Sequence, residues 1–191
     1  MELIIGICYT DTMEPTDILS QFDRFLAERG LALEAIVIGG AALALLGVIS
    51  RQTRDCDVLY PQLPDAIKEA ASEFATQVRQ QGDVLADDWF NNGPSLLADV
   101  LPEGWRDRIQ IAFSGRVLQL STLGRMDLLR SKLFALCDRG TDLPDCVALA
   151  PIPDEIAVIL PWLEQQDANP DWPAHVDATL HDLVGRLDHG V

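Results

Sequence analysis

The stretch that decides the fold covers residues 39–59 and reads GGAALALLGVISRQTRDCDVL. Gly39 and Gly40 follow a short β-rich run, residues 35–38, and precede strong helix formers, so they are predicted at a strand-to-helix turn. Glycines there let backbone N–H groups approach a ligand at the helix N-terminus, where phosphate is favoured. The alternative is a tight turn that needs a positive φ, which is the commoner role of an isolated Gly-Gly pair.

Two carboxylates, Asp55 and Asp57, close this stretch before a second apolar pair. If residues 55–59 form a strand, alternation places both side chains on one face, about 7 Å apart. Mg²⁺ takes oxygen ligands from one or two carboxylates and from substrate phosphates, which suits phosphoryl or nucleotidyl transfer. Ion pairs with Arg51 and Arg54 at a strand edge explain the carboxylates equally well. Both interpretations stay open at this point.

The composition limits the class of protein. A chain of 191 residues suits one domain with a proper core, and 48% hydrophobic residues exclude general disorder. No apolar run approaches the roughly 20 residues of a membrane helix, and the first residues lack the features of a secretory signal. The four cysteines are scattered and are typical of reduced thiols. We therefore expect a cytoplasmic protein with no membrane partner.

The net charge of −16 restricts the partners further. Such a surface repels phosphate backbones, so broad binding of duplex DNA is not expected. An anionic ligand would have to be held by a local cluster of cations or by a bridging metal.

Hydrophobic periodicity predicts most of the elements. Residues 1–12 are either an edge strand or an extension upstream of a start at Met13. Helices are predicted from Pro15 to a Gly30 cap and at 64–80, 123–139, 146–150, 154–166 and 174–187, and a β-hairpin at 108–113 and 117–120. The segment 87–94 is predicted to be a polar loop whose two aromatic residues pack onto the domain, with a base pocket as the less favoured use.

Lys132 lies in a helix with apolar residues on nearly every side. A lysine in that setting must extend to the surface, pair with an acid, or face an anionic ligand. Extension to the surface is the commonest outcome for a single lysine.

Three segments in this order, GGAALALLG, SRQTRDCDVL and DLLRSKLFALCDRGTDLPDCVAL, resemble the nucleotidyltransferase superfamily of the DNA polymerase β type. Within it, the chain is similar over about residues 16–150 to small bacterial proteins related to AbiEii-type abortive-infection toxins. The resemblance implies an α/β (α+β) fold, with a mixed β-sheet flanked by helices. It divides the chain into an extension or edge strand (1–15), a nucleotidyltransferase-like core (16–122) and a helical C-terminal part packed on the core (123–191).

The resemblance also implies roles for single residues. Gly39 and Gly40 would hold the triphosphate of an NTP, and Asp55 and Asp57 would bind Mg²⁺. Lys132 would act at the nucleotide. The remaining residues assigned to nucleotide binding are Arg51, Arg54, Asp142 and Asp145. These enzymes often carry a third acid on a later strand, but residues 108–113 and 117–120 contain no carboxylate.

Three functions follow as hypotheses. The first is Mg²⁺-dependent transfer of a nucleotide to a protein, an RNA such as tRNA, or a small-molecule hydroxyl, in a toxin-antitoxin setting. The net charge favours a protein or small-molecule acceptor unless Arg51, Arg54, Arg125, Arg130 and Arg139 gather at the cleft. The second is a catalytically weakened nucleotide-binding protein, and the third is an antitoxin-like partner without enzyme activity.

Overall fold

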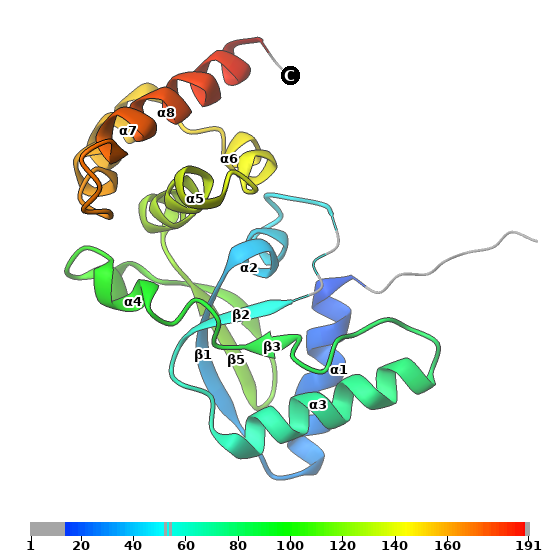
Figure 1. Ribbon diagram of the computed structural model, residues 1–191. Coiled ribbons are helices and arrows are strands. Elements are labelled where there is room, and N and C mark those ends of the chain that lie inside the picture. The colour runs from blue at the N-terminus through cyan, green and yellow to red at the C-terminus, as the bar shows by residue number, and fades with distance from the viewer. Residues whose placement is uncertain (1–13, 52, 54, 190–191) are drawn as a thin grey trace, which may run out of the picture.

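The computed structural model describes residues 14–51, 53 and 55–189 (Figure 1). The alternatives for residues 1–12, and with them a start at Met13, lie outside the described residues.

One mixed sheet organises the described part of the chain, with five strands in the order β3-β2-β1-β5-β4. The strands are β1 (Leu33–Ile38), β2 (Cys56–Tyr60), β3 (Phe90–Asn91), β4 (Gln110–Ser114) and β5 (Leu118–Thr122). The central strand, β1, pairs antiparallel with β2 and parallel with β5. Five of its six residues are buried, as expected for a strand covered on both faces. The expected α/β class, a mixed sheet flanked by helices, is confirmed.

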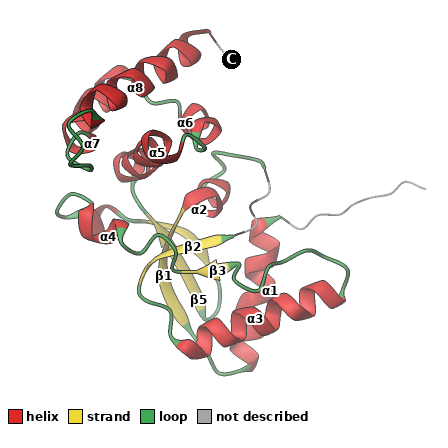
Figure 2. Cartoon of the chain, in the orientation of Figure 1, coloured by secondary structure: helices red, strands yellow, loops and turns green. Residues whose placement is uncertain are grey.

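Helices cover the sheet and extend beyond it (Figure 2). They are α1 (Pro15–Glu28), α2 (Gly39–Leu45), α3 (Asp65–Gln80), α4 (Leu97–Val100), the 3-10 helix η1 (Trp105–Arg108), α5 (Arg125–Arg139), α6 (Leu143–Leu149), α7 (Pro153–Leu163) and α8 (Trp172–His189). Buried apolar residues of α1 and α3 form one cluster with residues of the sheet. Those of α5 to α8 form a second cluster, which is joined by Leu43 of α2. The division of the chain at residue 122 stays a prediction.

The predicted helices and the hairpin are present, with shifts of a few residues at their ends. The segment 87–94 differs, because it contains the short strand β3, which pairs with β2. Its aromatic residues Trp89 and Phe90 are buried and pack around Phe22 of α1. The two aromatic residues are thus part of the hydrophobic core, which is the role that the sequence favoured over a base pocket. Helices α4 and η1 were not expected.

A buried carboxylate ties the first helix to the far end of the sheet. Asp23 of α1 accepts backbone hydrogen bonds from Arg116, Val117 and Leu118 at 2.8–2.9 Å. These residues close the turn between β4 and β5. Burial raises the pKa of Asp23, but the three N–H donors outweigh it, and the pKa lies below its ordinary value. Asp23 therefore fixes the position of the hairpin against α1.

We expect Asp23→Asn to lower the free energy of unfolding by about 2–4 kcal/mol at pH 7, because its amide N–H groups would face backbone donors. The lowered pKa means that this stabilisation is complete above the ordinary value near 3.8 and is lost as the pH falls through the folded pKa. Denaturant titrations should thus show the two proteins converging in strong acid. Asp17→Asn, at an exposed position of the same helix, is the control. Equal effects of both substitutions at pH 7 would contradict this role.

Candidate functional site

A cavity of about 900 Å³, called the pocket below, lies where the ends of β1 and β2 meet helices α2, α4 and α5. It is lined by Ile38, Gly39, Gly40, Arg51, Thr53, Asp55, Asp57, Gly93, Pro94, Leu96, Leu97, Val100, Ser131, Lys132, Phe134, Ala135, Asp138, Arg139, Asp142, Asp145 and Gln166. Except for Arg54, which lies outside the described residues, every site residue expected from the sequence lines this pocket. Segments far apart in the sequence therefore meet at one place.

The glycine turn touches the carboxylate strand. Gly39 begins α2 directly after β1 and has a φ of +76°, in the left-handed region that favours glycine. A methyl group on Gly39 would lie 2.7 Å from Asp57 Oδ2. The residue must therefore be glycine for two reasons, its backbone conformation and the closeness of the Asp57 carboxylate. The structure therefore contains the turn with a positive φ that the sequence offered as the alternative. The same turn forms one wall of the pocket.

Asp57 carries a carboxylate in an unfavourable electrostatic position. Its pKa is raised, first by burial and second by the negative charge of Asp55. A hydrogen bond from Asn91 and the charges of Lys132 and Arg139 lower the pKa, but they do not outweigh the other two effects. A cation between the two aspartates would remove this repulsion.

Asn91 occupies the position next to Asp57 in the neighbouring strand. The register of β2 and β3 pairs the two residues directly. The Asn91 Oδ1 atom accepts a hydrogen bond from the Gly93 N–H at 2.6 Å, which fixes the side chain. Strands β4 and β5 contain no carboxylate, and the strand beside β2 is β3. An amide stands there instead of a carboxylate.

Lys132 is buried and paired with two acids, so it does not extend to the surface. Its Nζ atom donates to Asp145 at 2.6 Å and to Asp142 at 2.8 Å. Burial lowers the pKa of Lys132, but both hydrogen bonds raise it, and the net shift is upward. Arg51 contacts Asp145 at 2.7 Å and Arg139 contacts Asp142 at 3.0 Å, which extends the pairing into one network.

Of the five arginines considered for RNA binding, the structure describes four, and two of these four line the pocket. Arg51 and Arg139 line it and are paired with its carboxylates. Arg125 instead pairs with Glu155, and Arg130 with the buried Asp127. The ion pairs of Arg51 with Asp55 or Asp57, considered as an alternative from the sequence, are replaced by its contact with Asp145. Arg54, the other arginine of that alternative, lies outside the described residues. The predicted strand begins one residue later than expected, so Asp57 lies within β2 while Asp55 directly precedes it.

The charged residues that line the described pocket are three cations and five carboxylates. A triphosphate alone would be repelled by that excess of negative charge. Among the described residues, no group of three or more His, Cys, Asp or Glu side chains is arranged to hold a metal ion. Mg²⁺, however, commonly binds one or two carboxylates and completes its shell with phosphate and water oxygens. Asp55 and Asp57 fit that donor set.

Three features in or beside the pocket were not predicted from the sequence. Asn91 lies in a two-residue strand within a polar segment, which no periodicity could reveal. Gln166 follows α7 and reaches the pocket only through the packing of α7 on α5. The apolar residues of α4 were also unassigned.

Comparison with known proteins gives a match at the level of a family. The model of a family described as nucleotidyltransferase of unknown function (DUF6036) matches residues 16–149. No curated protein and no solved structure matches the chain. No helix in the described part of the chain combines the length and hydropathy that a membrane span needs.

We expect Gly39→Ala to lower the free energy of unfolding by about 2–4 kcal/mol, from a strained backbone and from contact with Asp57. Gly47→Ala is the matched control, because Gly47 has a φ of +69° but nothing within 4 Å of an added methyl group. It should cost only the backbone strain, about 1–2 kcal/mol. Thermal or denaturant unfolding measures both. Equal losses would show that Asp57 does not restrict this position.

We expect Lys132→Met to lower the free energy of unfolding by about 3–5 kcal/mol, since it leaves two buried carboxylates without their shared cation. Lys68→Met provides the comparison, because Lys68 forms an exposed ion pair with Asp65 at 3.2 Å. That loss should stay within about 1 kcal/mol. A small effect at Lys132 would indicate that Arg51 and Arg139 alone balance the acids.

Proposed function

We propose, from the premise that the chain belongs to the nucleotidyltransferase family of unknown function DUF6036, that this protein transfers a nucleotide from an NTP to a hydroxyl group with the help of Mg²⁺. The observation that carries the proposal is the contact between the Gly39 turn and Asp57 within one pocket. Phosphate binding and metal binding need neighbouring groups of these two kinds.

Each part of the pocket has a role in this proposal. Asp55 and Asp57 would hold Mg²⁺, and the turn at Gly39 and Gly40 would give the phosphates close access to the backbone. A bound Mg²⁺ would offset the negative charge that develops on the phosphates during transfer. Arg51 and Arg139, at the rim, would contact the outer phosphate oxygens.

Lys132 has a less direct role than the resemblance implies. Its ammonium group is shared by Asp142 and Asp145, so much of its charge is already compensated. We infer that Lys132 chiefly positions these acids and the two arginines bound to them. The direct contribution of Lys132 to phosphate binding would then be modest.

A protein or small-molecule hydroxyl is the favoured acceptor. The net charge of −16 and the internal pairing of Arg125 and Arg130 provide little attraction for an RNA such as tRNA. A relation to AbiEii-type abortive-infection toxins, and a toxin-antitoxin partner with it, remain predictions from the sequence resemblance.

A nucleotide sensor without turnover is the second candidate function. Asn91 stands beside Asp57 where a third acid would be expected, and an amide is a poorer base for an attacking hydroxyl than a carboxylate. A sensor would bind an NTP with Mg²⁺ through the same residues and release it unchanged.

Asp57→Ala tests the proposal most directly. We expect it to abolish Mg²⁺-dependent NTP binding in calorimetry and to reduce transfer of labelled nucleotide at least about a hundredfold, because it removes a metal ligand. Circular dichroism should show an unchanged fold. Asp55→Ala should act in the same direction.

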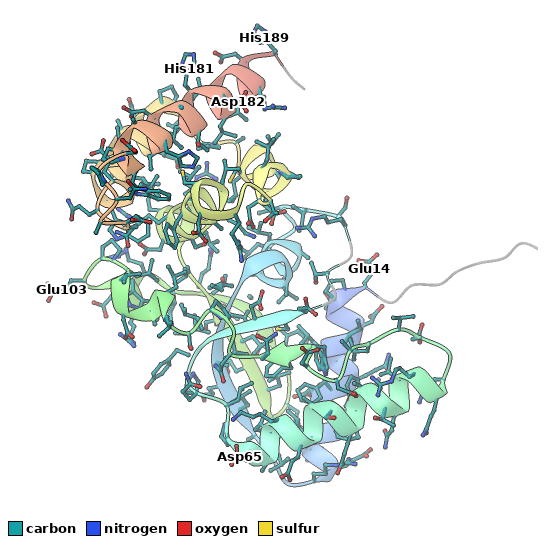
Figure 3. The ribbon with its side chains drawn as sticks, viewed as in Figure 1. Glu14, Asp65, Glu103, His181, Asp182 and His189 are labelled. Carbon is teal, nitrogen blue, oxygen red and sulfur yellow. The ribbon has the colours of Figure 1, made fainter. Side chains whose placement is uncertain are left out.

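Asp65→Ala is the control, because Asp65 is an exposed acid at the far end of the molecule from α5 (Figure 3). It should leave binding and transfer unchanged. Metal-dependent binding without transfer to any acceptor would favour the sensor. Failure of the folded protein to bind any NTP would overturn both functions and direct the search to protein partners.

A further inference from the structure

Strand β3 lies beside the two aspartates that would hold Mg²⁺, and its side chain at this point affects how many ions can bind. Asn91 of β3 pairs directly with Asp57 of β2 in the register of the sheet. A carboxylate at this position would offer a metal a further oxygen ligand. An amide can present either an oxygen atom or an N–H group. The number of ions therefore depends on which way the Asn91 amide is turned.

Two backbone groups fix the orientation of the Asn91 amide. The Gly93 N–H donates to Asn91 Oδ1 at 2.6 Å, and Asn91 Nδ2 donates to the Asp88 carbonyl oxygen at 3.2 Å. Turning the amide over would place Nδ2 against a donor and Oδ1 against an acceptor, so one orientation alone satisfies both partners. The second hydrogen of Nδ2 is then the one that bonds to the Asp57 carboxylate.

The next residue, Asn92, anchors the chain between Asn91 and Gly93. Its Nδ2 atom donates to the carbonyl oxygens of Val58 and Pro61, both at 3.0 Å. Its Oδ1 atom accepts from the Leu63 N–H at 2.7 Å. These contacts hold the chain after β3 against the end of β2. The Gly93 N–H is thereby kept in place for the Asn91 amide.

An N–H group beside Asp57 opposes a second ion in two ways. It occupies a lone pair of the carboxylate, and its positive end faces the place where another cation would bind. Among the other acids that line the described pocket, Asp142 and Asp145 are paired with Lys132, and Asp138 is a single exposed acid. No group of three or more His, Cys, Asp or Glu side chains in the described part of the chain could replace the missing ligand.

We propose that the pocket binds a single divalent ion, held by Asp55 and Asp57, and that Asn91 sets this limit. The inference rests on the proposed function, which assigns Mg²⁺ to these two aspartates. Two divalent ions in one site lie about 3.5–4 Å apart. Before any phosphate binds, they carry twice the charge that two carboxylates can balance. A second ion would need a third acid beside Asp57, where the amide presents a donor instead.

The test counts bound Mn²⁺, which accepts the same oxygen ligands as Mg²⁺ and is visible in electron paramagnetic resonance. The full chain is titrated alone and with one equivalent of each NTP, and nucleotide without protein serves as the blank. Wild type should bind one ion per chain, and one per protein–nucleotide complex, without magnetic coupling between ions. Asp57→Ala should bind none in the absence of nucleotide.

Asn91→Asp should admit a second ion, because a carboxylate at this position supplies the missing ligand. We expect two ions per chain, with the magnetic coupling that their close approach produces. Asn92→Asp is the matched control. It makes the same change of charge one residue further on, but its side chain contacts the carbonyl oxygens of Val58 and Pro61 and not Asp57. It should still bind one ion, and circular dichroism checks the fold of both variants.

Two coupled ions in wild type would overturn the inference and keep the proposed function. One ion in folded Asn91→Asp, or a second ion in Asn92→Asp as well, would overturn the role of Asn91. Absence of any bound ion in wild type, with and without nucleotide, would overturn the proposed function itself. The count on wild type needs no variant, so it decides the limit of one ion even if neither variant folds.

Discussion

The buried ammonium group of Lys132 between Asp142 and Asp145 is the interaction on which the arrangement of the pocket depends. It joins α5 to the start of α6 at 2.6 and 2.8 Å in a place from which water is largely excluded. Arg51 extends the same network to the segment before β2. Because buried charges tolerate little displacement, the network fixes α5 against α6 and holds Arg51 beside them. Apolar packing alone would allow these elements more freedom.

A second constraint acts at the opposite wall. The absence of a side chain on Gly39 lets the carboxylate of Asp57 lie against the turn between β1 and α2. The carboxylate is therefore held by shape on one side and by the hydrogen bond from Asn91 on the other. The result is a preorganised acid whose charge is poorly compensated by the protein, which is the condition in which a site gains most from binding a cation.

The elements with long periodic patterns could be predicted, and those fixed by tertiary contacts could not. Helices α1 and α3 each bury one regular face, so their sequences reveal them. Strand β3 has two residues and exists only because Asn91 and its neighbour pair with β2. Some pocket residues could be predicted because their residue type is unusual in its sequence context. Examples are the glycine pair before a helix, Asp57 beside an apolar strand and Lys132 in an apolar helix. Gln166 and Val100 are ordinary surface residues by sequence, and only the packing of α7 against α4 and α5 gives them a common location.

The position of β1 has a consequence for the synthesis of the chain. As the central strand, β1 has hydrogen-bonding partners that lie on both sides of it in the sheet but only after it in the sequence. The edge of β1 that pairs with β2 can form its hydrogen bonds once about residue 60 has emerged from the ribosome. The edge that pairs with β5 stays without partners until residues 118–122 have also emerged. Throughout that interval a hydrophobic strand would present an open edge, the kind of surface that chaperones cover and that neighbouring nascent chains can bind.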